Sequence, residues 1–205
     1  MSEVRTLDVS GLKQYEISNQ APLWWGQLMI VFIEGTMFAI LIAAYFYTRL
    51  RMDVWPPPGD QYPHLLLPSV ALIPLVLSCL GTYWAGDSAK KNDRAGMLGG
   101  LGLNLVLAGI ALAMRIVEWH SLNFNWMTDI QGSYVWAFLG LHTFDYIGDL
   151  VFTAVLFVLI AIGRYGPKQR QGVYVDSVVW YFLVAIWIPI YVVIYWGPVI
   201  VGTQQ

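Results

Sequence analysis

Five long stretches of mostly apolar residues divide the chain, and polar or charged segments separate them. The five stretches cover residues 24–48, 66–86, 96–118, 133–163 and 176–198. About 20 apolar residues are needed to cross a bilayer as a helix, and lipid cannot satisfy free backbone groups. The stretches are also longer than the strands of a membrane barrel. The pattern therefore predicts an all-α integral membrane protein, a bundle of five transmembrane helices.

The segments between the predicted helices contain residues that interrupt helices. Residues 55–59 read Trp-Pro-Pro-Pro-Gly, which predicts a rigid extended turn because proline cannot continue a helix. The polar residues 87–95 predict a short charged loop, and Gly166-Pro167 predicts the end of the fourth span. The fourth stretch is longer than a bilayer requires, so we expect that helix to tilt or to project into water.

Composition supports the membrane assignment. Of the 205 residues, 58% are hydrophobic and only 12% are charged. A soluble domain carries about 25% charged residues, so most of this surface must face something other than water. The ten tryptophans fit a protein with two membrane–water interfaces. Disorder, nucleic-acid binding and a secreted disulfide scaffold are excluded by the same figures.

The distribution of Lys and Arg predicts the orientation in the membrane. With five spans, the N-terminal segment and the loops at 87–95 and 164–172 share one side, which carries eight of the eleven basic residues. By the positive-inside rule we expect the N-terminus in the cytoplasm and the C-terminus outside. Residues 1–22 lack the order of a signal peptide. We expect them to form a cytoplasmic arm before a single membrane domain over 23–205.

One acidic residue lies near the middle of the first predicted span. Glu34 follows Phe32-Ile33, and its apolar neighbours offer little help in solvating a carboxylate. A charged side chain at that depth costs about 3 kcal/mol or more. The residues alone leave two interpretations open: a protonated Glu34 hydrogen-bonded to a neighbouring helix, or a site that handles protons.

The fourth predicted span carries a polar stripe. His142, Asp145 and Asp149 are spaced by three and four residues, which places all three on one face of a helix. That face must point into protein, because lipid does not tolerate such a stripe. Both polar contacts between helices and a proton relay are compatible with it.

Charged residues near the ends of spans complete the set of candidates. Arg115 and Glu118 are three residues apart and can form an ion pair, with a lipid headgroup clamp as the alternative. Asp176 begins the fifth predicted span, where a helix N-terminus favours an anion, so capping explains it. Three histidines and one cysteine are too few for a haem or copper site, so we expect this chain to bind no redox metal.

Several short motifs follow one another in a distinctive order. They are Trp24-Trp25-Gly26, Phe32-Ile33-Glu34, Ala44-Tyr45-Phe46-Tyr47-Thr48-Arg49, the proline-rich turn, Glu118-Trp119, Gly140-Leu141-His142 and residues 175–180. In order and spacing they resemble subunit III of the haem-copper respiratory oxidases, in its short five-helix form. Two positions depart from that family. Asp145 stands at the place of its second fourth-helix histidine, and Val173 replaces the histidine before the final aspartate.

The resemblance implies a non-catalytic subunit with a lipid-filled cleft, packed on subunit I. In this family haem and copper reside in partner subunits I and II, and the complex reduces O2 to water while pumping protons. Subunit III supports proton uptake, and Glu34 falls on the family's membrane carboxylate, which reacts with hydrophobic carbodiimides. Lipid-binding or interhelical polar roles are expected for Arg49, Arg115, Glu118, His142, Asp145, Asp149 and Asp176.

The resemblance also indicates the bacterial cytoplasmic (inner) membrane as the location, with structural phospholipids as partners. Three other functions stay open at this stage. They are subunit III of a quinol oxidase, an accessory subunit of a nitric oxide reductase, and an independent proton channel.

Overall fold

The computed structural model describes residues 21–55, 63–122, 124–127, 129–164 and 166–197. Within these ranges every secondary-structure element is a helix. The helices are α1 (Pro22–Arg51), α2 (Leu66–Lys90), α3 (Arg94–Ser121), α4 (Ile130–Ala161) and α5 (Pro167–Tyr191), with one π-helical turn, η1 (Val192–Trp196), after α5. Five helices are long and apolar enough to cross a membrane, which confirms the predicted fold class.

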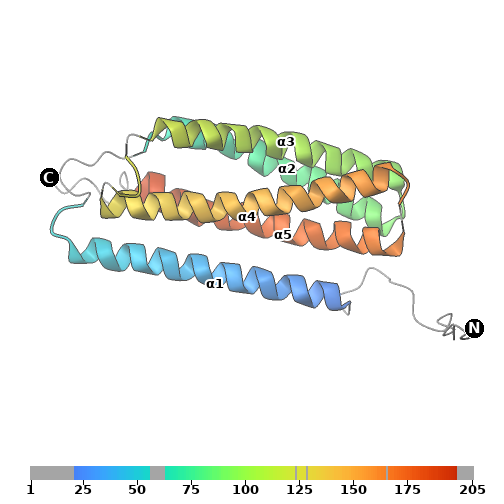
Figure 1. The fold of residues 1–205 in the computed structure, drawn as a ribbon, viewed down its shortest axis with the longest axis horizontal. Coiled ribbons are helices and arrows are strands. Elements are labelled where there is room, and N and C mark those ends of the chain that lie inside the picture. The colour runs from blue at the N-terminus through green and yellow to red at the C-terminus, as the bar shows by residue number, and fades with distance from the viewer. Residues whose placement is uncertain (1–20, 56–62, 123, 128, 165, 198–205) are drawn as a thin grey trace, which may run out of the picture.

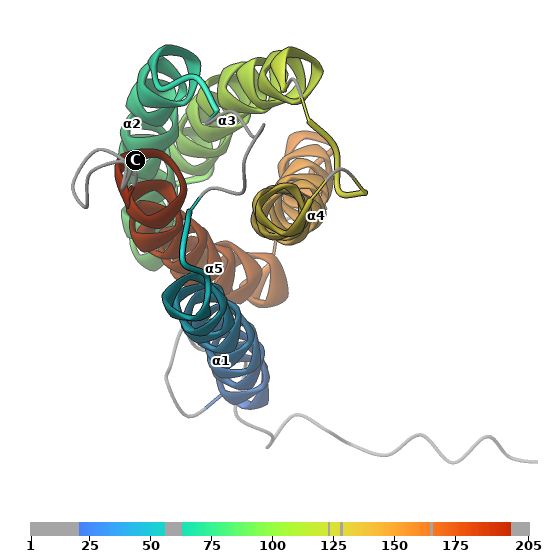
Figure 2. The same cartoon turned by 90° about the vertical axis from the view of Figure 1, so that its left-hand side faces the viewer.

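Four of the helices form a closed ring, and the first lies beside it. Contacts join α2 to α3, α3 to α4, α4 to α5, and α5 back to α2. Helix α1 packs mainly on α5 and touches α4 less; the end view places it outside the ring (Figures 1 and 2). In the most apolar stretch of α5, 50% of the residues are buried, against 11% in α1. Helix α5 is therefore the centre of the bundle.

The turn between α2 and α3 is shorter than the expected loop over 87–95. Helix α2 continues to Lys90 and α3 begins at Arg94. Asn92 makes the tight turn with φ of 59°, a conformation that asparagine tolerates better than most residues. The side chain of Asp93 then caps α3 by accepting a hydrogen bond from a backbone N–H. Polar composition therefore overestimated the length of this loop.

The start of α5 corrects a second prediction. Gly166 and Pro167 do not close the fourth span, which ends at Ala161; they begin α5. Proline is favoured at the first helical position because its missing N–H would have no partner there. Helix α5 consequently starts nine residues before Asp176 and not at it.

Two other sequence predictions fall mainly outside the described residues. The expected cytoplasmic arm over 1–22 is described only from residue 21, and the proline-rich turn at 55–59 only at Trp55.

Candidate functional site: a carboxyl-lined cleft and a buried ion pair

A cleft of about 310 Å³ lies between α1, α4 and α5. Glu34 lines it from α1, and Asp145 and Asp149 line it from α4. Phe144 and Phe152 contribute apolar wall. The structure therefore brings the membrane carboxyl of the first span together with both acids of the fourth, which lie more than a hundred residues away in the sequence.

The three carboxyl groups each keep a side-chain oxygen without a hydrogen-bond partner among the described residues. These atoms are Glu34 Oε2, Asp145 Oδ2 and Asp149 Oδ2. Asp149 is the most enclosed, with 8% of its surface exposed. When charged, the carboxylates of Glu34 and Asp145 repel each other, and that of Asp149 is repelled by Asp176 and by Glu34. Because several unpaired negative charges are costly in such a setting, the arrangement is chemically suited to holding protons.

Asp176 lies behind this cleft, at the contact between α4 and α5. Thr153 Oγ1 donates to its two carboxyl oxygens, at 3.0 Å to Oδ1 and 3.1 Å to Oδ2. The expectation that Asp176 caps the fifth helix is wrong, because a helix dipole acts only within the first turn and α5 begins at Pro167. Asp176 is instead a polar link between two helices.

His142 does not share the cleft with the two acids that follow it. Its Nε2 lies 3.1 Å from the carbonyl oxygen of Leu183, and its ring centroid is 4.6 Å from that of Trp187. It lines a different and much smaller cavity, of about 20 Å³, together with Arg115. The three residues follow one stripe of α4, but at the level of His142 that stripe packs on α5, whereas Asp145 and Asp149 open onto the cleft.

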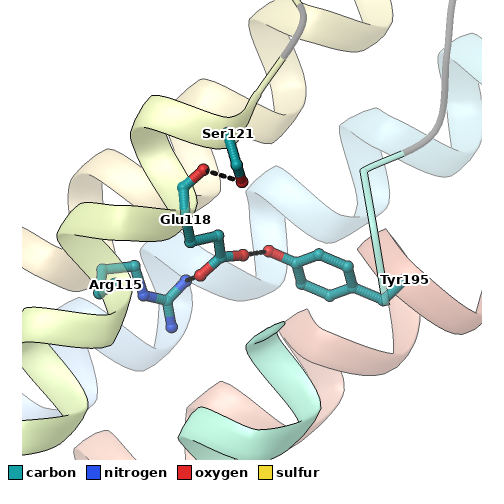
Figure 3. A network of polar contacts seen from close by, with 4 residues as sticks. All are labelled: Arg115, Glu118, Ser121 and Tyr195. Atoms are coloured by element: carbon teal, nitrogen blue, oxygen red, sulfur yellow. Dashed lines mark hydrogen bonds and ion pairs between the residues drawn. The ribbon is translucent and has the colours of Figure 1, made fainter. Parts of the chain in front are cut away.

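A second polar cluster joins α3 to the π-helical turn η1 (Figure 3). Arg115 Nη1 lies 3.3 Å from Glu118 Oε2, within ion-pair distance although without hydrogen-bond alignment. The hydroxyl of Tyr195 donates to Glu118 Oε1. Ser121 Oγ donates to the Glu118 carbonyl at 2.7 Å, and the Arg115 guanidinium lies 3.6 Å from the centroid of the Trp187 ring. Arg115 is thus held by a carboxylate and an aromatic face.

Burial decides what this cluster can do. Arg115 is 8% exposed and Glu118 is 2% exposed, so the predicted ion pair is confirmed and lies inside the protein. A carboxylate this enclosed links helices more readily than it reaches a lipid headgroup. Sequence reasoning missed Tyr195 and Trp187, because no spacing rule connects residues on separate helices.

Arg49 lies apart from both clusters. It is in the last turn of α1, close enough to Tyr45 to interact with its hydroxyl. Nearby, Tyr134 OH donates to the carbonyl of Ala44 at 3.0 Å and lies 2.7 Å from Thr48 Oγ1. These contacts fasten α1 to α4 at one end. The role of Arg49 itself stays a prediction.

In the part of the chain that the structure describes, no group of three or more His, Cys, Asp or Glu side chains is arranged to hold a metal ion.

The residues of both polar clusters lie within the part of the chain that resembles known proteins. Residues 7–199 match the family described as cytochrome c oxidase subunit III. A protein named cytochrome c oxidase subunit 3 from Synechocystis sp. is 27% identical over 172 residues, 83% of this chain and 74% of that protein. A protein of the same name from Thermostichus vulcanus is 25% identical over 171 residues, which are 83% of this chain and 85% of that protein. The Saccharomyces cerevisiae protein of that name is 26% identical over 180 residues, 85% and 67% of the two chains.

Proposed function

Because the chain belongs to the cytochrome c oxidase subunit III family and is subunit III of a haem-copper oxidase, we propose that it is non-catalytic. Its proposed role is to support the catalytic subunits of the complex. Family membership implies a complex with other oxidase subunits. In the proposed arrangement the chain packs directly on subunit I, with subunit II and any further subunits completing the complex. Haem and copper then belong to those partners. The names of the relatives favour cytochrome c over quinol as the electron donor.

The carboxyl-lined cleft is the observation that carries this proposal. Glu34 lies twelve residues after Pro22, which is about 18 Å along the helix and near the middle of a bilayer core of about 30 Å. The apolar walls around Phe144 and Phe152 fit phospholipid acyl chains. The carboxyls of Glu34, Asp145 and Asp149 would hold protons beside subunit I and so support proton uptake.

The proposed orientation places the start of α1 in the cytoplasm of a bacterium, with the inner membrane as the location. Helices α1, α3 and α5 begin at the same end of the bundle, where α2 and α4 finish (Figure 1). That end carries basic residues in both of its turns: Lys90, Lys91, Arg94 and Arg164. By the positive-inside rule this end faces the cytoplasm, and in the proposed arrangement a cytoplasmic arm precedes a single membrane domain over 23–205.

Purification through a tag on this chain is expected to retain haem-containing partner subunits. The reason is that a supporting subunit has no separate role and buries part of its apolar surface against subunit I. An absorption spectrum of the purified material in mild detergent checks this directly. Recovery of a stable, haem-free homo-oligomer from the native membrane would contradict the proposal.

Replacing Glu34 with alanine is expected to shorten the time for which the complex stays active during turnover, several-fold, while its haem content stays the same. The variant removes the carboxyl that faces Asp145 across the cleft. The measurement is the number of turnovers completed before activity is lost, with haem quantified by absorption.

Two further variants make this result specific. Glu34→Gln keeps the volume and hydrogen-bonding capacity but cannot release a proton, so it should behave like Glu34→Ala. Thr36→Ala alters an exposed residue of the same helix whose hydroxyl donates to the carbonyl of Ile33 within that helix, and should match the wild type. A Glu34→Gln variant as durable as the wild type would rule out a proton-handling role for this carboxyl.

A further inference from the structure

A second groove, of about 280 Å³, lies between α2 and α5, near the end of the bundle where α5 begins. It shares no lining residue with the carboxyl-lined cleft. We call it the Lys90 groove, and the side chains that matter here are Tyr83, Asp87, Lys90, Tyr174, Ser177 and Tyr181. None of them has a part in the role proposed above for Glu34 and the cleft.

Lys90 is the cation of this groove. Its Nζ lies 5.0 Å from the centroid of the Tyr174 ring, and that ring stacks on Trp24 of α1 at 5.6 Å. Asp87 also lines the groove, but its carboxylate is bound to Lys91 at 2.6 Å. The hydrogen bond from Lys91 to Asp87 raises the pKa of Lys91, and the two opposite charges of this ion pair offset each other. Among the described residues, no carboxylate forms an ion pair with Lys90.

Hydroxyl donors surround the same space. In the described part of the chain, no hydrogen bond engages the phenol groups of Tyr83, Tyr174 or Tyr181. The hydroxyl of Ser177 is not available to donate to a ligand, because its Oγ donates to the carbonyl of Val173 at 2.8 Å. An ammonium group beside a phenolic O–H donor, as Lys90 has in Tyr174, is complementary to a phosphate oxygen.

The position of the groove fits a molecule that is partly in lipid. Lys90 is the last residue of a helix long enough to span the membrane, so we expect its ammonium group at the membrane surface. Tyr83 and Tyr181 lie further along the groove and are exposed at the protein surface. Tyrosine is favoured at membrane interfaces because its ring is apolar and its hydroxyl is polar. From Lys90 and Tyr174 the groove thus continues along Val178 and the rings of Tyr83 and Tyr181 toward the bilayer core.

We propose that the Lys90 groove binds one anionic phospholipid, with its phosphate on Lys90 and an acyl chain between α2 and α5. The net positive charge selects an anionic lipid over a zwitterionic one, because Asp87 is neutralised by Lys91 and so does not compensate Lys90. This inference does not depend on the role proposed for Glu34 and the cleft. It adds a lipid site on the opposite side of α5.

The test is native mass spectrometry of the purified complex titrated with phosphatidylglycerol or with phosphatidylcholine. One Lys near the membrane surface contributes enough to change affinity for an anionic lipid about five-fold. Lys90→Gln should therefore bind phosphatidylglycerol about five-fold more weakly, and its phosphatidylcholine binding should be unchanged. Lys90→Arg keeps the charge and should retain most of the wild-type affinity.

Arg164→Gln is the matched control. It removes the same charge from an exposed residue at the same end of the bundle, outside the groove. Equal weakening in Arg164→Gln and Lys90→Gln would overturn the proposal, because the effect would then come from net charge. Loss of a partner subunit in Lys90→Gln would also overturn it, by identifying the groove as a protein interface.

Discussion

Replacing Glu118 with alanine is expected to lower the free energy of unfolding of the helical bundle by about 3–5 kcal/mol. Glu118 is almost fully enclosed and lies 3.3 Å from Arg115. Without it, the Arg115 guanidinium keeps its charge inside the protein, beside the Trp187 ring, with no carboxylate paired to it among the described residues. The hydroxyl of Tyr195 loses its acceptor at the same time. Thermal unfolding of the purified complex, together with the amount of this chain retained in it, measures the effect.

A set of variants separates the charge from the hydrogen bond. Tyr195→Phe removes only the hydroxyl and should cost about 1.5–3 kcal/mol, the usual contribution of a hydrogen bond to a charged group. Glu118→Gln keeps an acceptor for Tyr195 but leaves Arg115 unpaired, so it should be nearly as damaging as alanine. The double variant Arg115→Met/Glu118→Leu removes both charges and should be less damaging than Glu118→Ala alone. If the double variant costs the sum of Arg115→Met and Glu118→Leu measured separately, the ion pair has no coupling energy.

The five helices could be predicted because the membrane acts on local composition. A span needs its own run of apolar residues, whatever it packs against, so each run is visible in the sequence. Helix ends were less predictable. The residues of 87–95 are polar because they lie at the membrane surface, and most of them are still helical. A Gly-Pro pair in a sequence can mark the end of one helix or the start of the next. The structure shows that Gly166-Pro167 starts α5.

The candidate site was predictable only where its residues are close in sequence. The spacing of Arg115 and Glu118 was enough to predict their ion pair. The grouping of Glu34 with Asp145 and Asp149 depends on how α1 packs beside the ring of four helices, which no local pattern encodes.

The Lys90 groove illustrates the same limit. Lys90 and Lys91 are equivalent in the sequence, but in the structure one pairs with Asp87 and the other faces a groove built from two helices.

Gly100→Ala is expected to force α2 and α3 apart, with a net cost of about 3 kcal/mol or less. A Cβ at Gly100 would lie 2.6 Å from the carbonyl oxygen of Gly81 and would also overlap the backbone nitrogen of Ala85. A backbone atom cannot rotate away, so one helix must shift. In membranes such small-residue contacts allow close packing and replace the hydrophobic effect as a source of association. The midpoint of thermal unfolding of the purified complex reports the change.

Gly109→Ala is the control on the same helix. Apart from its chain neighbours and the backbone of its own helix, no described atom lies within 4 Å of a Cβ placed there, so this variant loses no packing and gains about 1 kcal/mol of helix propensity. It should therefore unfold at the same or a higher temperature than the wild type. Separation of α2 and α3 in Gly100→Ala should also lengthen the bond of 2.7 Å that Asn104 Nδ2 donates to Thr82 Oγ1. Adding Asn104→Ala to Gly100→Ala should then cost less than Asn104→Ala costs alone. If both glycine variants unfold at the same temperature, the two backbones are not in contact at Gly100.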